Sequence, residues 1–180
     1  MLEHRCVLVV VTGGIACYKA CEVVSSLRKA GADVRVVMTE NATKFVSPLT
    51  FETLSNNPVA VDTFRRETPW EVEHVSLAKR ADIAVVVPAT ANVIGKMACG
   101  IADDMATTTL LAVKAPIVVC PAMNVNMYEN EAVRDNIALL KKRGFLFVEA
   151  DEGFLACGDV GKGRLAAPAV IVQKVVDTLM

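Results

Sequence analysis

The chain has 180 residues, 53% of them hydrophobic, and a formal net charge of −1. This length suits one domain with its own core. No apolar run approaches the roughly 20 residues of a membrane-spanning helix, and no signal peptide is visible. We therefore expect a cytoplasmic protein without a membrane segment. The balanced charge argues against nucleic acid as a partner, and six cysteines without a C-x-x-C pair beside two histidines argue against a metal site.

The first part of the sequence predicts a β-α-β unit. Residues 5–11 are a short apolar run typical of a buried strand, which Gly13-Gly14 interrupts. A helical pattern of apolar residues follows and ends at Gly31, and residues 33–38 predict the next strand. Two strands joined by one helix imply a parallel sheet with a right-handed crossover.

The same alternation continues along the rest of the chain. It predicts helices over residues 47–55, 90–98, 105–113, 129–143 and 168–179, and strands over residues 83–87, 117–120 and 145–148. Pro88 and Pro121 are expected to end two of these strands. No linker or repeat interrupts the pattern, so residues 1–180 are predicted to be one doubly wound α/β domain, Rossmann-like and flavodoxin-like, with a mostly parallel sheet.

Doubly wound sheets bind ligands outside the carboxyl ends of their strands. Four segments follow predicted strands, and we expect them to converge on one rim: residues 12–15, 39–40, 88–92 and 121–128. Gly13-Gly14 before a helix suits a bound phosphate, although an ordinary strand–helix turn explains the pair equally well.

The rim favours a mononucleotide over a dinucleotide. The fingerprint G-x-G-x-x-G is not met, a Walker A loop is absent, and the neutral hydroxyl of Thr39 follows the second strand where NAD-binding proteins place a carboxylate. Thr90 is either a ligand or only a helix N-cap. Asn92 offers the donor and acceptor that the polar edge of a flavin requires.

Five motifs resemble those of the flavin-dependent cysteine decarboxylases, and the resemblance extends over essentially the whole chain. They are VTGGIACYKA at 11–20, EHVSLAKRAD at 73–82, PATANVIGKMACGIADD at 88–104, PAMNVNMY at 121–128 and ACGDVGKGRL at 156–165. The last is similar to the substrate flap of one branch, the phosphopantothenoylcysteine decarboxylases. The resemblance implies FMN as the cofactor and a mobile substrate flap at about residues 151–167.

The activity that the resemblance implies is decarboxylation of 4′-phospho-N-pantothenoylcysteine to 4′-phosphopantetheine in coenzyme A biosynthesis. Flavin-dependent oxidation gives a thioaldehyde, CO₂ is lost, and re-reduction of the ene-thiolate leaves no net redox change. The resemblance implies His74 as the acid–base or electrostatic catalyst, Asn124 as the group holding the departing carboxylate, and Cys157 as the proton donor. A helix cap and a turn residue are the alternative interpretations of His74 and Asn124.

The same motifs imply a full set of contact residues. The expected cofactor-binding residues are Gly13, Gly14, Ile15, Ala16, Thr39, Phe51, Pro88, Ala89, Thr90, Ala91, Asn92 and Met123. The expected substrate-binding residues are Asn124, Met127, Ala156, Cys157, Gly158, Asp159, Lys162 and Arg164. The flap glycines are expected to act as hinges, and Lys162 and Arg164 either meet the substrate phosphate or are solvated. Asp103 and Asp104 are explained by helix capping.

The resemblance also implies a homo-oligomer, either a trimer or a dodecamer built from trimers, with the active site at a subunit interface. Some members carry a fused phosphopantothenate–cysteine ligase domain. Three alternatives remain: an FMN-dependent oxidative decarboxylase of C-terminal peptide cysteine, which the flap motif disfavours; a non-catalytic flavoprotein regulatory subunit; and an NAD-binding protein, which the missing fingerprint disfavours.

Overall fold

The computed structural model describes residues 2–65, 72–154 and 158–180. Its centre is a six-stranded sheet in the order β3-β2-β1-β4-β5-β6, in which every neighbouring pair is parallel. The strands are β1 (Cys6–Val11), β2 (Asp33–Met38), β3 (Val59–Ala60), β4 (Ile83–Ala89), β5 (Ile117–Pro121) and β6 (Leu146–Phe147). The predicted doubly wound α/β fold is confirmed, with the strand order of Rossmann sheets.

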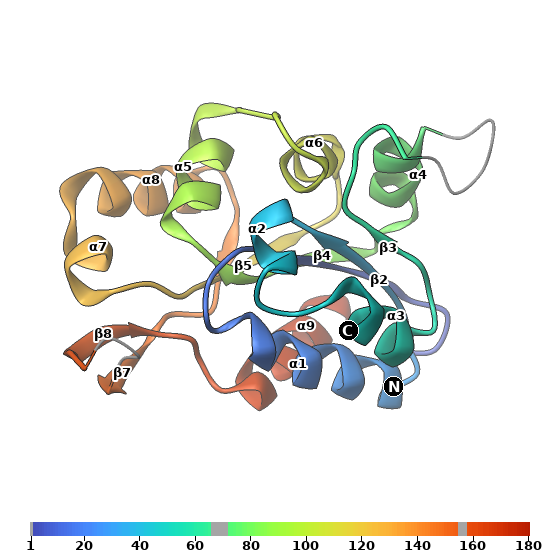
Figure 1. Ribbon diagram of the computed structural model, residues 1–180, viewed down its shortest axis with the longest axis horizontal. Coiled ribbons are helices and arrows are strands. Elements are labelled where there is room, and N and C mark those ends of the chain that lie inside the picture. The colour runs from blue at the N-terminus through green and yellow to red at the C-terminus, as the bar shows by residue number, and fades with distance from the viewer. Residues whose placement is uncertain (1, 66–71, 155–157) are drawn as a thin grey trace.

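Helices cover both faces of the sheet (Figure 1). One face carries α1 (Cys17–Lys29), α3 (Pro48–Ser55) and α9 (Pro168–Leu179), and the other carries α4 (Glu73–Arg80), α5 (Ala91–Cys99), α6 (Met105–Ala112) and α8 (Glu131–Lys142). Two short helices, α2 (Glu40–Thr43) and α7 (Val125–Glu129), follow β2 and β5 at the carboxyl edge. In the described part of the chain, no helix is both long enough and apolar enough to cross a bilayer.

Strand β1 is buried on both faces, which explains its unbroken apolar run. Val7, Val9 and Val11 belong to the core cluster beneath α1 and α9, while Leu8 and Val10 belong to the cluster beneath α5 and α6. All five side chains are fully buried. A parallel sheet covered by helices requires this composition, and each such side chain contributes about 1.5–3 kcal/mol on burial.

Strand β4 is longer than predicted. It continues through Pro88 to Ala89, which pairs with Pro121 of β5 after a shift of register. Pro88 lacks an N–H group, but its carbonyl oxygen accepts a hydrogen bond from Thr12 Oγ1 at 2.6 Å. The expectation that Pro88 ends this strand is therefore wrong, because the shifted register accommodates the missing donor.

The helix predicted over residues 129–143 is two helices. α7 ends at Glu129, and α8 begins at Glu131. Asn130 separates them, since its side-chain oxygen accepts a hydrogen bond from Ala132 N at 3.0 Å and so caps α8. The single-helix prediction is wrong at this residue, whereas the inward positions Ile137 and Leu140 are buried as expected.

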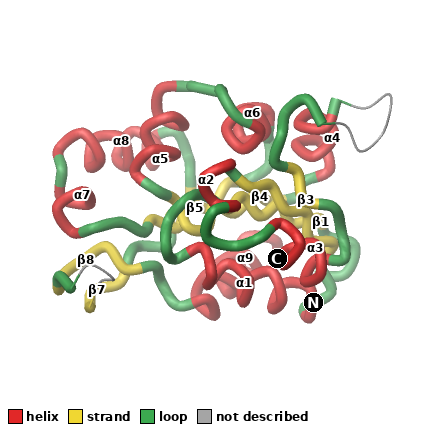
Figure 2. Tube along the Cα trace, in the orientation of Figure 1, coloured by secondary structure: helices red, strands yellow, loops and turns green. Residues whose placement is uncertain are grey.

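The flap region contains a two-stranded antiparallel hairpin outside the main sheet (Figure 2). Its strands are β7 (Asp151–Phe154) and β8 (Val160–Arg164). The chain enters it after the buried residues Val148 and Ala150, and leaves it at the buried Leu165 and Ala166. The hairpin is therefore a projection held by two buried ends, beside the carboxyl edge of the sheet.

Candidate active site

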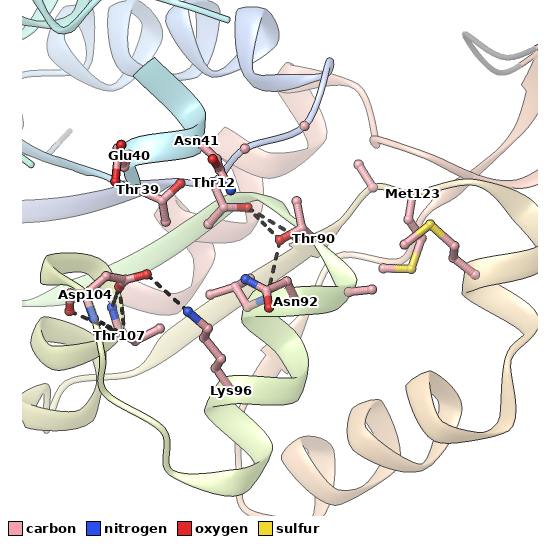
Figure 3. Close-up of a pocket in the computed structure, with 16 residues that line it drawn as sticks. Thr12, Thr39, Glu40, Asn41, Thr90, Asn92, Lys96, Asp104, Thr107 and Met123 are labelled. Carbon is pink, nitrogen blue, oxygen red and sulfur yellow. Dashed lines mark hydrogen bonds and ion pairs between the residues drawn. The ribbon is translucent and has the colours of Figure 1, made fainter. Parts of the chain in front are cut away.

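The four segments predicted to converge do meet at one edge of the sheet. With residues of α5 and α6 they line a cavity of about 610 Å³ (Figure 3), which we name the cofactor cavity after the ligand that the sequence leads us to expect there. Its lining residues are Thr12, Gly13, Gly14, Thr39, Glu40, Asn41, Thr90, Ala91, Asn92, Val93, Lys96, Asp104, Thr107, Ala122, Met123 and Met127. This volume is within the usual range for small-molecule sites.

The turn between β1 and α1 forms one end of the cofactor cavity. A Cβ atom on Gly13 would lie 2.5 Å from the Cβ of Asn41, so only glycine lets this turn approach α2. Within the described residues, the N–H groups of Gly13, Ile15 and Ala16 have no acceptor, and no side chain caps α1. These groups are therefore available to an anion at the start of α1.

Two threonines connect the strands at the cavity floor. The buried Thr12 donates through Oγ1 to the Pro88 carbonyl, and the same oxygen accepts from Thr90 N at 3.2 Å. Thr90 Oγ1 accepts from Val93 N at 3.3 Å, which confirms Thr90 as the N-cap of α5. Thr39 caps α2 in the same way, through Ala42 N. Both caps also line the cavity.

A lysine and two aspartates form the wall beside α6, as Figure 3 shows for Lys96 and Asp104. Lys96 Nζ lies 2.6 Å from Asp103 Oδ1 and 3.5 Å from Asp104 Oδ2. The hydrogen bond to Asp103 raises the pKa of Lys96, so this cation persists. Asp104 caps α6, as expected, through Thr107 N at 2.7 Å.

A second cavity of about 500 Å³ adjoins the first, and we name it the hairpin cavity. It lies between the start of α1 and the β7–β8 hairpin, and shares only Gly14, Ala122 and Met123 with the cofactor cavity. Its other lining residues are Ile15, Ala16, Tyr18, Lys19, Asn124, Phe154, Gly163, Arg164 and Leu165. The P-A-M-N segment is therefore the partition between two ligand-sized spaces.

Asn124 is held at both ends of its amide. Its Oδ1 accepts from Asn126 N at 2.9 Å and caps α7, so the predicted turn role is present. Its Nδ2 donates to Asp159 Oδ2 at 2.7 Å. Asp159 belongs to the flap motif, so the flap contacts the residue expected to hold the substrate carboxylate.

β8 lies unusually close to the segment that carries Met123 and Asn124. Met123 N donates to the Gly163 carbonyl at 2.9 Å, and a Cβ atom on Gly163 would collide with the carbonyl oxygen of Met123. A Cβ atom on Gly161 would lie 2.8 Å from Val125 Cγ2. At these two positions glycine serves close packing, which corrects the expectation that both act as hinges.

The two flap cations have different environments. Lys162 lines neither cavity; its Nζ lies 3.6 Å from Glu149 Oε2 and 5.6 Å from the centre of the Tyr128 ring. Arg164 lines the hairpin cavity, with Nη2 3.7 Å from Asp151 Oδ2. Of the two, only Arg164 is placed to meet a ligand.

His74 lies in the first turn of α4 and lines neither cavity. Figure 1 shows α4 and the hairpin at opposite ends of the molecule. The buried Nδ1 atom of His74 has no hydrogen-bond partner among the described residues. The start of α4, at Val72, has no side-chain cap, so the helix-cap interpretation of His74 is wrong.

Five expected cofactor contacts do not line the cofactor cavity. Phe51, Pro88 and Ala89 are buried and line neither cavity, whereas Ile15 and Ala16 line the hairpin cavity. Met127 lines the cofactor cavity, and Gly158 is exposed beside Asp159. Ala156 and Cys157 lie outside the described residues.

Sequence reasoning missed several cavity residues. In the cofactor cavity these are Asn41, Lys96, Asp104 and Thr107, and in the hairpin cavity Tyr18, Lys19, Phe154 and Leu165. Thr12 and Glu40 lie in the predicted rim segments but were not among the expected contacts. One signal was present: Lys96 follows Asn92 by four residues, which puts both on one face of α5.

The model of the flavoprotein family matches residues 1–180. The chain belongs to the flavoprotein family. It is 57% identical over 173 residues to the coenzyme A biosynthesis bifunctional protein CoaBC of Bacillus subtilis (strain 168), covering 96% of this chain and 43% of that protein. It is 42% identical over 175 residues to the probable phosphopantothenoylcysteine decarboxylase of Streptococcus mutans serotype c, covering 96% and 98%. The chain thus spans less than half of this bifunctional relative.

Solved structures of other proteins share the fold. A cysteine-to-serine mutant of PPC decarboxylase, complexed with pantothenoylaminoethenethiol, superposes with a TM-score of 0.85 at 27% identity, covering 96% of both chains. The FMN-dependent cysteine decarboxylase SpaF superposes with a TM-score of 0.85 at 29% identity, covering both chains completely.

Proposed function

We propose that this flavoprotein is an FMN-dependent phosphopantothenoylcysteine decarboxylase, which converts 4′-phospho-N-pantothenoylcysteine into 4′-phosphopantetheine for coenzyme A biosynthesis. The observation that carries the proposal is the partition at Met123 and Asn124, where a cofactor-sized and a substrate-sized cavity meet and the flap Asp159 contacts Asn124. The names of the Bacillus and Streptococcus relatives support the same activity.

The donor set of the cofactor cavity fits FMN. The Gly13 N–H group before α1 lines this cavity and suits the phosphate, whereas Ile15 and Ala16 line the hairpin cavity. The hydroxyls of Thr12, Thr39 and Thr90 line the same space as Gly13. Asn92 offers an amide to the polar edge of the ring, and Met123 offers a polarisable surface for its face. FMN supplies a hydride acceptor that also returns the hydride, so the reaction has no net redox change.

Asn124 binds the substrate carboxylate in this proposal. A neutral amide orients the anion without the strong ion pair that would oppose loss of its charge as CO₂ leaves. Asp159 accepts a hydrogen bond from Nδ2 and Asn126 N donates to Oδ1, so both contacts fix which end of the amide faces the cavity. Asp159 thus positions the Asn124 amide, and its hydrogen bond to Asn124 forms when the hairpin lies over the site.

Cys157 supplies the final proton to the product. A thiol of ordinary pKa, about 8.5, is protonated at neutral pH and able to donate, which suits this role. The hairpin that carries it limits access of water to the cavity below.

His74 acts from a neighbouring subunit in this proposal. It is distant from Asn124 within one chain, whereas Ile15 and Tyr18 beside the hairpin cavity are more than half exposed and are available for a subunit contact. A homotrimer, alone or within a dodecamer, with the active site at the contact between subunits accounts for the distance of His74 from Asn124 and for the exposure of Ile15 and Tyr18. We further propose a cytoplasmic location and, as in bifunctional relatives, fusion to a ligase domain that supplies the substrate.

The test of the activity is mass spectrometry of 4′-phospho-N-pantothenoylcysteine incubated with the purified protein. We expect loss of CO₂, a flavin absorbance spectrum, and no turnover of a peptide ending in cysteine. Asn124→Ala is expected to abolish turnover but retain FMN, since Asn124 lines only the hairpin cavity. Loss of CO₂ from the peptide alone, or protein that binds no flavin, would contradict the proposal.

Mixing variants tests the shared site. Asn124→Ala and His74→Asn subunits, each inactive alone, are expected to regain part of the wild-type activity when dissociated and reassembled together, because some interfaces then contain both native residues. Two variants that both alter Asn124 provide the control and stay inactive. No recovery in mixed oligomers would place His74 and Asn124 in the same subunit's site.

A further inference from the structure

We propose that the hairpin cavity holds the phosphorylated arm of the substrate, and that Lys19 of α1 and Arg164 of β8 bind its phosphate. The inference rests on the proposed decarboxylase activity and adds to it a phosphate subsite and a residue, Lys19, that is absent from the expected contact residues. It is carried by the position, the charge and the apolar surface of this cavity.

The position follows from Asn124. This residue lines the hairpin cavity and not the cofactor cavity, while Met123 lines both. A substrate whose carboxylate is at Asn124 therefore has its reacting carbon beside the partition, and the rest of the molecule extends away from the flavin into the hairpin cavity.

The charge distinguishes the two cavities. The charged residues lining the cofactor cavity are Glu40, Lys96 and Asp104, of mixed sign. Among the described residues, the charged ones lining the hairpin cavity are Lys19 and Arg164, both positive. A phosphate monoester carries a charge of roughly −1.5 to −2 near pH 7, which matches two cations.

Lys19 has no contact with a carboxylate of the described residues, whereas Arg164, like Lys162, has one long and exposed contact with a carboxylate. The Lys19 side chain makes no hydrogen bond or ion pair with the described residues. It also lies in the first turn of α1, where the helix dipole disfavours a cation unless an anion is nearby. Arg164 lies against Gly153, on which a Cβ atom would be 3.1 Å from Nη1, and its exposed contact with Asp151 is a long 3.7 Å.

The remaining surface is apolar. Ile15, Tyr18 and Phe154 line the cavity and are 57%, 58% and 71% exposed. Exposed apolar side chains grouped beside two cations suit a ligand with an apolar arm and an anionic end. The phosphorylated pantothenoyl arm has both, whereas a peptide ending in cysteine lacks the anion.

The experiment compares kinetics on 4′-phospho-N-pantothenoylcysteine and on N-pantothenoylcysteine, which lacks the phosphate. Lys19→Met keeps the length of the side chain and removes its charge, and Lys162→Met is the matched control. We expect Lys19→Met to raise KM for the phosphorylated substrate by about 10- to 100-fold, the effect of losing one charge-assisted hydrogen bond. We expect no change in kcat, in FMN content, or in KM for the unphosphorylated substrate.

Lys19→Arg is expected to restore most of the affinity, and Arg164→Gln to act as Lys19→Met does. The inference would be overturned if Lys19→Met lost affinity equally for both substrates, or if Lys162→Met lost affinity for the phosphorylated substrate instead. It would also be overturned if Lys19→Met lost FMN, a result that would assign Lys19 to the cofactor. A change of oligomeric state without the KM effect would assign the apolar surface to a second copy of the chain. Wild-type protein inactive on both substrates would instead refute the decarboxylase itself.

Discussion

The close contact between Gly163 of β8 and Met123 leads to a specific prediction for Gly163→Ala. At this residue φ is +151°, and the built Cβ collides with the carbonyl oxygen of Met123. A methyl group there must push β8 away from the Met123–Asn124 segment. Because this segment separates the two cavities, we expect the change to damage catalysis more than folding.

The magnitude follows from two effects. Positive φ disfavours alanine by about 1–2 kcal/mol, and loss of the Met123 N–H to Gly163 carbonyl bond removes about 1 kcal/mol more. The hairpin shares no strand with the main sheet, so this strain relaxes by moving β8 and does not unfold the core. A displacement of roughly 1 Å at a catalytic site lowers the rate about 100-fold, and we expect that loss in kcat/KM.

Gly144→Ala provides the matched control. Gly144 has φ +91° and no atom within 4 Å of a built Cβ, so this variant has the backbone strain without the collision. Gly144 follows α8 and lines neither cavity. We expect Gly144→Ala to lower Tm by about 2–8 °C and leave kcat/KM within about twofold of wild type.

The assay measures kcat/KM, bound FMN and Tm for both variants. If Gly163→Ala kept kcat/KM within about threefold of wild type, the close contact between β8 and Met123 would not matter to the site. If both variants lost activity equally, backbone strain alone would explain the effect, and the argument from the collision would be refuted.

Two further predictions concern one buried and one exposed polar contact. Thr12→Val leaves the Pro88 carbonyl and the Thr90 N–H without a buried partner, so we expect a loss of about 2 kcal/mol and a Tm lower by roughly 4–8 °C; an unchanged Tm would contradict this. The hydrogen bond from Lys141 holds the pKa of Glu149 below its ordinary 4.5, so this contribution to stability is present above that pH and is lost as the pH falls. The Tm difference between wild type and Glu149→Gln should therefore shrink from pH 7 to pH 3, whereas a constant difference would refute a role for the charge.

The parts of the fold that were predicted correctly depend on local signals. The strand over residues 33–38 and the end of α1 at Gly31 were found because an apolar run and a glycine with positive φ need no distant partner. Asn130 carried a local signal too, as a capping residue before Glu131, but the helical periodicity on both sides concealed it.

The hairpin was not predicted because its glycines remove the alternating side chains that identify a strand. β8 is defined by its contacts with β7 and with Met123, which are distant in sequence. Lys19 was missed for the same reason, since the cavity it lines exists only when the hairpin lies beside α1. Phe51 and Pro88 belong to segments near the site, and only the three-dimensional structure shows that these two side chains turn away from it.

The hairpin interrupts the connection between β6 and α9, and both of its ends are buried. Insertions, deletions or replacements between Glu152 and Gly163 therefore leave the register of the six-stranded sheet unchanged. The hairpin residues of the second cavity, Phe154 and Arg164 among them, can therefore be exchanged without altering the strands that form the cofactor cavity, whereas Lys19 and Asn124 lie outside the exchanged segment. A chimera that carries the hairpin of a peptide-specific relative on this sheet would be a direct route to a decarboxylase with altered substrate choice.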